Sequence, residues 1–306
     1  MSKILITGGK GFLGKKTAYK LSGMGYEVIC FDITPPKVNE DKNLPYKKIW
    51  GSILNPYDID KAIKGCETVI HLAAVVGVEI TEKKSLLCLH INIQGTSNVL
   101  DSAVKNKVKK IIFSSSSEVY GEQEKFPISE NASLIPKSNY GISKIAGEEY
   151  VRAYNQLYGL KFNICRFFNL YGLGQKKDFV IPKFANAIKT GNSIKVYGDG
   201  KQIRSYCHVN DAVNGIVNIL QKGQDNTIYN VGNDTEPISV FDLAQKMVNI
   251  SKKKIKIEKI SFEQSDRESH REIFRRQPSI EKLKKQTKYI PKIKLEMGIK
   301  KILTGT

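Results

Sequence analysis

The stretch TGGKGFLG, Thr7–Gly14, follows directly on the apolar run KILIT at residues 3–7 and decides how the chain folds. It puts Gly8, Gly11 and Gly14 at the point where a predicted strand turns into a helix. Gly8 permits the tight turn, Gly11 lets the backbone approach a pyrophosphate, and Gly14 allows close packing of the helix. The amino end of that helix presents N–H groups and a positive dipole to phosphates. A glycine triplet placed after the first strand therefore predicts a dinucleotide site.

Short apolar runs alternate with segments long enough for helices through the first half of the chain. This alternation is typical of a parallel sheet that helices cover on both faces. We therefore expect an α/β fold with a Rossmann-type doubly wound parallel sheet. Its predicted strands are KILIT (3–7), YEVICFD (26–32), ETVIHLAA (67–74), KKIIFSS (109–115) and KFNICRFF (161–168).

From about Leu170 the pattern loosens into glycine turns, short strands and isolated helices such as VFDLAQKMVNI (240–250). This change indicates a smaller C-terminal substrate-binding lobe. The run NDAVNGIVNIL (210–220) still has the pattern of a helix on the large sheet, so the two lobes interleave. We expect the dinucleotide-binding domain at residues 1–169 and about 203–222, and the second lobe at residues 170–202 and 223–306.

Asp32 ends the second predicted strand, roughly 20 residues beyond the glycines. An acid at this point accepts hydrogen bonds from a ribose 2′-hydroxyl and repels the additional phosphate of NADP. NAD is therefore the predicted cofactor.

Composition narrows the class of protein. The chain has 306 residues, 41% of them hydrophobic and 26% charged, which is ordinary for a globular enzyme. No run approaches the roughly 18 apolar residues of a membrane span, and the start MSKILITGG has no signal-peptide pattern, so we expect a cytoplasmic protein without a membrane partner. The net charge of +19 comes from lysines spread along the chain without a nucleic-acid motif. We expect a solvated basic surface, an anionic small substrate and no nucleic-acid partner.

The chain has five cysteines, an odd number without a C-x-x-C pair. This pattern predicts buried free thiols, with neither a disulfide framework nor a metal site. They are Cys30, Cys66, Cys88, Cys165 and Cys207.

Tyr140 and Lys144 lie four residues apart in YGISK, at the start of a helical pattern. Both side chains therefore lie on one face of the helix. An ammonium near a phenol, together with a positively charged nicotinamide, favours the phenolate and lowers the pKa of the tyrosine. Tyr140 is thus a candidate general base that takes a hydroxyl proton while hydride leaves the same carbon.

Taken in order, TGGKGFLG, FD, HLAA, NIQGT, SSSSEVYG, YGISK, RFFNLYG, VYGDGKQIRSY and NVGN run over nearly the whole chain. With this set the sequence resembles the extended short-chain dehydrogenase/reductase family, the nucleotide-sugar epimerases and dehydratases. The set is specific for the family and much less so for the reaction. The resemblance implies a nucleotide-diphosphate sugar (UDP-, GDP- or dTDP-linked) as substrate.

The resemblance also implies roles for individual residues. The catalytic hydroxyl lies four residues before the tyrosine of the VYG element, which selects Ser116 to act with Tyr140 and Lys144. Implied cofactor contacts are Gly8, Gly11, Phe12, Leu13, Gly14, Asp32, Ser52, Ile53, Leu72, Ala73, Ala74, Asn92, Ser114, Tyr140, Lys144 and Phe167. Implied substrate contacts are Ser116, Glu118, Tyr140, Asn169, Val180, Val196, Tyr197, Arg204, Arg267 and Arg271.

Two of these assignments depart from the family pattern. An aspartate often stands where this chain has Ser52, and the spacing around Arg267 and Arg271 differs from the usual one. Arg204 makes chemical sense independently, because a guanidinium binds a diphosphate through two parallel hydrogen bonds.

All members of the family begin by oxidising the sugar at C4 and differ in the fate of the 4-ketone. The 4,6-dehydratases carry adjacent Asp and Glu where this chain has Ser117 and Glu118, so the acid for dehydration is missing. Glu118 in SEVYG resembles the UDP-glucuronate decarboxylases, but the basic residue expected after YG is absent from YGLGQ.

We therefore expect a nucleotide-sugar 4-epimerase, since rotation of the ketone above NADH needs space and no extra catalytic group. A 4-dehydrogenase that releases the ketone and a UDP-glucuronate decarboxylase are the alternatives. A 4,6-dehydratase and a catalytically silent NAD-binding regulator rank below them. Glu118 is a candidate catalytic residue, or a polar support for its loop.

Two long helical patterns, at residues 83–106 and 140–159, carry more apolar surface than one sheet face needs. In the family these helices pair across a two-fold axis. We therefore expect a homodimer through a four-helix bundle.

Overall fold

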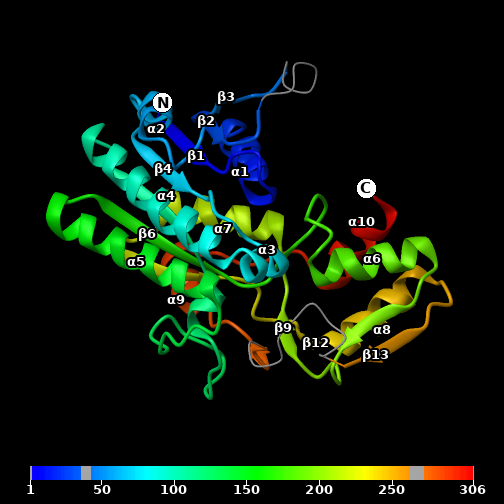
Figure 1. The fold of residues 1–306 in the computed structure, drawn as a ribbon. Helices are drawn as coiled ribbons and strands as arrows, with labels where there is room; N and C mark the ends of the chain where they lie inside the picture. The colour runs from blue at the N-terminus through cyan, green and yellow to red at the C-terminus, as the bar shows by residue number, and fades with distance from the viewer. Residues whose placement is uncertain (1, 36–42, 262–271, 306) are drawn as a thin grey trace.

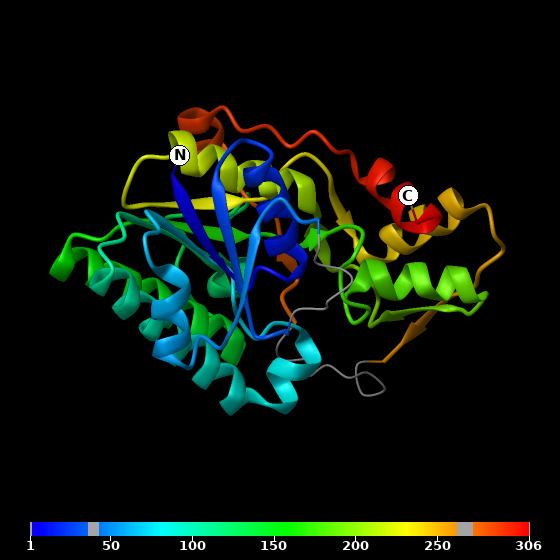
Figure 2. The same cartoon turned by 90° about the horizontal axis from the view of Figure 1, so that it is seen from above.

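A computed structural model describes residues 2–35, 43–261 and 272–305. The chain forms a large lobe and a small lobe side by side (Figures 1 and 2). The large lobe is built on a seven-stranded sheet of order β11-β6-β5-β4-β1-β2-β3, and every pair in it is parallel. Its strands are β1 (Lys3–Thr7), β2 (Glu27–Asp32), β3 (Lys47–Trp50), β4 (Thr68–His71), β5 (Lys110–Ser116), β6 (Lys161–Phe167) and β11 (Thr227–Val231).

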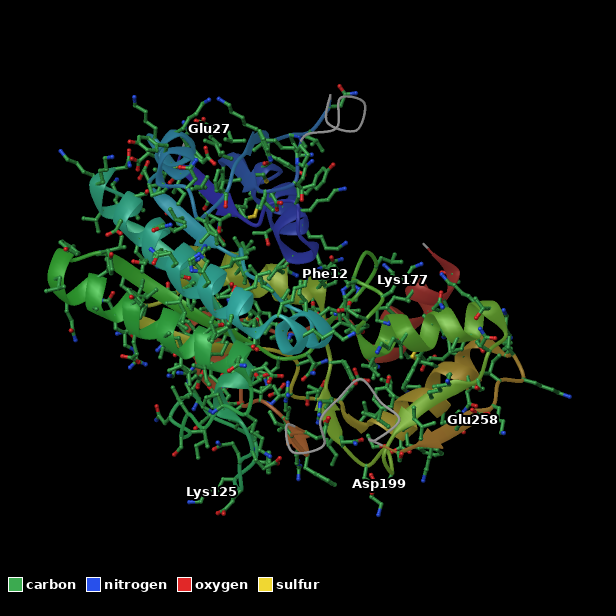
Figure 3. All side chains as sticks on the ribbon, viewed as in Figure 1. Phe12, Glu27, Lys125, Lys177, Asp199 and Glu258 are labelled. Atoms are coloured by element: carbon green, nitrogen blue, oxygen red, sulfur yellow. The ribbon has the colours of Figure 1, made fainter. Side chains whose placement is uncertain are left out.

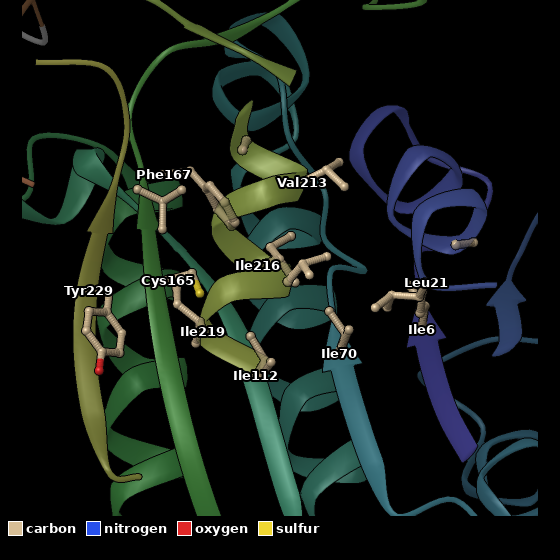
Figure 4. Packing of buried hydrophobic residues seen from close by; sticks show 14 of the residues in the cluster. Ile6, Leu21, Ile70, Ile112, Cys165, Phe167, Val213, Ile216, Ile219 and Tyr229 are labelled. Atoms are coloured by element: carbon tan, nitrogen blue, oxygen red, sulfur yellow. The ribbon is translucent and has the colours of Figure 1, made fainter. Parts of the chain in front are cut away.

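Helices cover both faces of this sheet (Figure 2), as the alternating pattern predicts. One face packs on α2 (Pro56–Ile63), α4 (Ser85–Lys105) and α5 (Asn139–Tyr158), and the other on α1 (Phe12–Ser22), α7 (Val209–Lys222) and α9 (Glu281–Thr287). Val213, Ile216 and Ile219 of α7 pack on sheet residues that include Ile70 and Ile112 (Figure 4). The Rossmann-type doubly wound fold is confirmed.

The edge strand β11 corrects the expected boundary between the lobes. Residues 223–306 were expected in the small lobe, but Thr227–Val231 pairs in parallel with β6. Helix α9 also packs against α7 and β11. The chain thus returns twice to the large sheet after entering the small lobe, because TIYNV is apolar enough to be buried as an edge strand.

The small lobe has its own apolar core, which includes Phe184, Leu243 and Ile299. Its helices are α6 (Val180–Thr190), α8 (Val240–Ser251) and α10 (Leu295–Thr304), and its strands are β8 (Ile194–Tyr197), β9 (Ile203–Ser205), β12 (Pro237–Ser239), β13 (Ile257–Ile260) and β14 (Arg275–Arg276). Strand β9 lies between β12 and β14. The short strands β7 (Leu170–Tyr171) and β10 (Cys207–His208) pair where the chain passes between the lobes.

The remaining short elements are α3 (Val78–Lys83) and the 3₁₀ turn η1 (Ser117–Tyr120), and both follow strands of the large sheet. The strand order reverses between β1 and β4, so the chain leaves the carboxyl ends of these strands in opposite directions. Open parallel sheets bind ligands in the crevice that such a reversal creates.

Side chains ending in nitrogen project from both lobes (Figure 3), which agrees with lysines that are spread along the whole sequence. All five cysteines are buried and unpaired, as predicted. Within the described residues, no helix is both long and apolar enough to cross a membrane.

Candidate active site

The glycine turn between β1 and α1 leaves no room for side chains. Gly8 has φ of +68°, and a Cβ on it would lie 2.8 Å from the amide nitrogen of Ala73. A Cβ on Gly14 would lie 2.2 Å from the carbonyl oxygen of Gly8. Helix α1 begins after Gly11 without a side-chain cap and has no acidic residue in its first turn. Its amino end is therefore suited to bind a phosphate.

Asp32 lies at the carboxyl end of β2 and faces the same turn. Its Oδ2 accepts a 2.9 Å hydrogen bond from the amide of Lys10, and its Oδ1 accepts one of 2.9 Å from Thr34. These bonds fix the carboxylate and leave each oxygen a further lone pair for a ribose hydroxyl. At Ser52, where the family often has an acid, the amide donates to Asp58 Oδ2 at 3.0 Å.

A cleft of about 1100 Å³ runs from this turn to the small lobe. Most of the predicted site residues line it. They are Gly8, Gly11, Phe12, Leu13, Gly14, Asp32, Ser52, Ile53, Leu72, Ala73, Ala74, Ser114, Ser116, Glu118, Tyr140, Lys144, Phe167, Asn169, Val180, Tyr197 and Arg204.

Two of the predicted residues that the structure describes, Asn92 and Val196, do not line the cleft. Asn92 lies behind its wall, where its side chain accepts from the Val75 amide at 2.8 Å and donates to Ser143 Oγ at 3.0 Å. Val196 is fully buried in the core of the small lobe, because the alternation of β8 turns it inward and Tyr197 outward. Arg267 and Arg271 fall outside the described residues.

Tyr140, Lys144 and the serine run meet in the middle of the cleft. Tyr140 and Lys144 lie on the first turns of α5, which begins after the cap Ser138. The Lys144 ammonium donates a 2.9 Å hydrogen bond to the carbonyl oxygen of Ser114 and lies 5.7 Å from the centre of the Tyr140 ring. Ser116 Oγ accepts from the Glu118 amide at 3.2 Å and so caps η1. The predicted group of Ser116, Tyr140 and Lys144 is therefore assembled.

Burial shifts the pKa values of both Tyr140 and Lys144. Burial, followed by the nearby Glu118 carboxylate, raises the pKa of Tyr140, although a hydrogen bond with Ser116 opposes the change. Burial also lowers the pKa of Lys144 to about 8. In the chain by itself desolvation dominates the pKa of both groups, whereas the expected lowering of the Tyr140 pKa depends on Lys144 and a cationic nicotinamide together. A phenolate at neutral pH requires the positive charge that a nicotinamide would add.

Glu118 has a partner that the sequence analysis missed. Its Oε1 forms an ion pair with Arg276 of β14, and its Oε2 accepts a 3.3 Å hydrogen bond from Ser138. Arg276 lines the cleft and stands opposite Arg204 in the ladder of β14 and β9. Arg204 is itself paired with Glu272. Two cations, Arg204 and Arg276, therefore lie side by side in the cleft, each held by a carboxylate.

The segment that carries Arg276 is tied to the large lobe as well as to β9. Glu122 accepts a 2.7 Å hydrogen bond from the amide of Phe274, and Lys137 donates one of 3.1 Å to the carbonyl of Glu272. Ile128 exchanges backbone hydrogen bonds with Gln277 and Ser279, at 2.8 and 2.7 Å. We call residues 272–279 the bridging segment, because both lobes bind it.

Comparison with known proteins places this site in a family. Residues 4–232 match the NAD dependent epimerase/dehydratase family. The UDP-N-acetyl-alpha-D-glucosaminuronate decarboxylase of Bacillus cytotoxicus is 34% identical to this chain. The match covers 98% of this chain and 96% of that protein.

Two solved structures are similar over almost the whole chain. The UDP-glucose 4-epimerase of Thermotoga maritima with UDP-glucose has a TM-score of 0.89 at 30% identity, covering 99% of this chain and 97% of that one. The UDP-glucuronic acid 4-epimerase of Bacillus cereus, in complex with UDP-glucuronic acid and NAD, has a TM-score of 0.89 at 26% identity, covering 99% and 98%. With the glycine turn, Asp32 and the Ser116, Tyr140 and Lys144 group in place, the chain belongs to the NAD dependent epimerase/dehydratase family, an extended short-chain dehydrogenase/reductase whose cofactor is NAD.

Proposed function

We propose that this enzyme is an NAD-dependent decarboxylase of a nucleotide-diphosphate hexuronic acid, which it first oxidises at C4. The ion pair of Glu118 with Arg276 in the substrate cleft carries this proposal. The sequence alone favoured a 4-epimerase, which needs only space for the ketone to rotate, and the lack of a basic residue after YG counted against a decarboxylase. Arg276, from the distant strand β14, supplies a basic side chain in the cleft instead. The decarboxylase that is 34% identical to this chain also supports ranking decarboxylation above epimerisation.

The residues act in the order that their positions allow. Tyr140, as the phenolate, accepts the C4 hydroxyl proton, while Ser116 holds the same oxygen by a hydrogen bond. NAD held by the glycine turn and Asp32 would supply the acceptor, and later the donor, of the C4 hydride. The Lys144 ammonium, fixed by the Ser114 carbonyl, adds positive charge beside the phenol. The product of this step is a 4-ketone whose C6 carboxylate is β to the carbonyl, which is the arrangement that loses CO₂.

Arg276 and Glu118 act on the C6 carboxylate and on C5, respectively. Arg276 binds the C6 carboxylate in the ground state, because a guanidinium matches a carboxylate in charge and geometry. Loss of CO₂ leaves an enolate whose C5 must gain a proton. Glu118 lies in the cleft close enough to act on Tyr140; as a carboxylate it first takes a proton from water and then passes that proton to C5, after which Tyr140 returns its own proton to the C4 oxygen as the ketone is reduced.

A 4-epimerase of the same acid is the second candidate. Within the described chain, Glu118 neutralises Arg276 directly, so their pair offers a sugar carboxylate little net positive charge. If the pair stays closed, the carboxylate remains on the sugar and the ketone rotates before reduction.

The deciding experiment incubates the NAD-loaded protein with UDP-glucuronate, UDP-N-acetylglucosaminuronate and UDP-glucose, and analyses the products by mass and NMR. A product lighter by the mass of CO₂ from either uronate supports decarboxylation. An unchanged mass with an inverted C4 centre supports the epimerase and rejects the decarboxylase.

We also propose that the protein is a homodimer through α4 and α5. These helices pack on each other and expose Leu86, Leu87, Ile142, Leu157 and Tyr158. A second copy that covers this surface would bury apolar area that a monomer leaves in water. Light scattering at micromolar concentration checks the proposal, and a monomer would contradict it.

A further inference from the structure

A buried ion pair lies directly behind the catalytic group. Glu148 of α5 and Arg166 of β6 are 0% and 1% exposed. Arg166 donates two hydrogen bonds to the Glu148 carboxylate, of 2.9 Å to Oε1 and 2.6 Å to Oε2. The hydroxyl of Ser115 donates a third bond to Oε1, at 2.5 Å.

The same network reaches three further residues. Arg166 donates at 3.0 Å to the hydroxyl of Tyr120 and at 3.1 Å to the carbonyl of Glu130. Tyr120 in turn donates at 2.6 Å to Asn230 of β11. The pair therefore joins β5, η1, α5, β6 and β11 at the carboxyl edge of the sheet.

Neither member of the pair reaches the reacting atoms, because Glu148 and Arg166 do not line the cleft. Their neighbours in the chain do. Ser115 lies between Ser114, which holds Lys144, and Ser116, and Arg166 is followed by Phe167. Glu148 follows Lys144 by one helical turn, so the two side chains lie on the same side of α5.

We propose that the pair of Glu148 and Arg166 is a positioning element for C4 oxidation, which fixes the end of β5 against α5 and supplies the anionic charge that faces Lys144. Ser115 is the link between the pair and the catalytic serine. This role explains why two charges are kept where water cannot reach. Apolar residues of similar volume at such sites are often equally stable or more stable, so stability alone does not account for a buried pair.

Of the titratable groups that face Lys144, Glu148 is the one that is negatively charged near neutral pH. Tyr140 and Glu148 face it from α5, Cys88 from α4 and His71 from β4. Burial raises the pKa of Cys88 and lowers that of His71 to about 3, so both are uncharged near neutral pH. Cys88 and Glu148 are the two groups that oppose the desolvation of the Lys144 ammonium, and of these Glu148, ion-paired with Arg166, is the one that is negatively charged near neutral pH.

The first test reads the charge of Lys144 without any sugar. The nicotinamide of NAD is cationic and Lys144 lines the cofactor cleft, so the NAD dissociation constant should change with pH as Lys144 loses its proton. Calorimetry on cofactor-free protein gives the midpoint of this change in wild type and in Glu148→Gln. We expect the midpoint to move to lower pH by about one unit or more. Glu149→Gln is the matched control, because Glu149 is the next residue and pairs with Arg152 on the surface.

An unchanged midpoint in folded Glu148→Gln would overturn the proposal. Since that variant leaves Arg166 without its anion, Glu148→Met combined with Arg166→Met provides a second route to a folded protein. The double variant should unfold near the wild-type temperature and bind NAD with a midpoint that is also lowered, though by less than in Glu148→Gln, because no unpaired Arg166 charge remains. A double variant with the wild-type midpoint would show that the pair only stabilises the fold.

The second test concerns the link through Ser115. Ser115→Ala keeps the ion pair and removes only the bond to β5. We expect the NAD midpoint to stay at the wild-type value, while single-turnover reduction of bound NAD by the sugar nucleotide that the wild type oxidises becomes slower. A wild-type rate in Ser115→Ala would refute the positioning role of this link.

Discussion

Lys144 of α5 donates a 2.9 Å hydrogen bond to the carbonyl oxygen of Ser114, so this lysine side chain itself fastens α5 to the end of β5. The lysine thus has two tasks that are separable in principle. Its backbone contact holds α5 in place, and its charge acts on Tyr140, 5.7 Å away at the ring centre. Substitutions of the two residues should therefore have different consequences.

Tyr140→Phe should bind NAD and sugar nucleotide like the wild type, because the ring still packs against its neighbours. It should lose turnover by roughly 10²-fold to 10⁴-fold, the contribution of a positioned general base. Single-turnover formation of NADH measures the loss, with binding checked by calorimetry. Reduction of NAD at the wild-type rate would mean that another group, with Glu118 the nearest candidate, is the base.

Lys144 should make the free energy of unfolding depend on pH. Burial lowers the pKa of its ammonium from 10.5 in the unfolded chain to about 8 in the folded one. Below about pH 8 the lysine is charged in both states, so the full desolvation penalty is present. Between about pH 8 and pH 10.5 the unfolded chain holds more protons, and stability rises with pH by up to roughly 3 kcal/mol.

The measurement is urea unfolding of cofactor-free wild type and Lys144→Met near pH 7 and near pH 10.5. The variant lacks the titrating group and its desolvation penalty. The difference in free energy of unfolding, variant minus wild type, should therefore decrease as pH rises. An equal difference at both pH values would show that the pKa of Lys144 is the same in the folded and the unfolded chain.

Asp32→Ala should weaken NAD binding and narrow the preference for NAD over NADP. The substitution removes the ribose acceptor, the charge that repels a 2′-phosphate, and the bonds that hold Lys10 and Thr34. Trp50 is the only tryptophan of the chain, and its indole donates to the carbonyl of Ile33 beside Asp32. Its fluorescence provides the binding signal, and equal affinities of the wild type for NAD and NADP would contradict the assignment.

Arg276→Gln should change the affinity for nucleotide-linked uronic acids and leave the affinity for nucleotide-linked neutral sugars unchanged. If Arg276 binds the C6 carboxylate, the variant loses affinity for UDP-glucuronate and keeps its affinity for UDP-glucose. Calorimetry with both nucleotides measures the difference. Arg275→Gln is the matched control, because Arg275 is the adjacent arginine, stacks on Phe126 and does not line the cleft. An equal loss for both sugars would assign Arg276 to the nucleotide end instead.

The parts of this enzyme that sequence could predict are those that local patterns encode. The turn at Gly8 and Gly14, the acid Asp32 at the end of a strand, and the helical spacing of Tyr140 and Lys144 each depend on a few neighbouring residues. Local sterics and periodicity determine them, so the described fold agrees with the expectation.

The missed features depend on pairing across long distances. Arg276 meets Glu118 only because β14 adds to β9 in one register, and nothing near either residue signals it. Strand β11 was misassigned because a short apolar run fits an edge of either lobe. Val196 was expected in the cleft because a resemblance identifies a strand without stating which face of it is buried.

The bridging segment, residues 272–279, limits how this enzyme can be recombined with its relatives. Its hydrogen bonds run to β9 of the small lobe and to Glu122, Ile128 and Lys137 of the large lobe. A chimera that exchanged only the small lobe would place a foreign segment against a native loop and lose the match between Glu118 and Arg276. The unit of exchange for a new sugar specificity therefore includes residues 117–138 together with the small lobe, although the two are far apart in the chain.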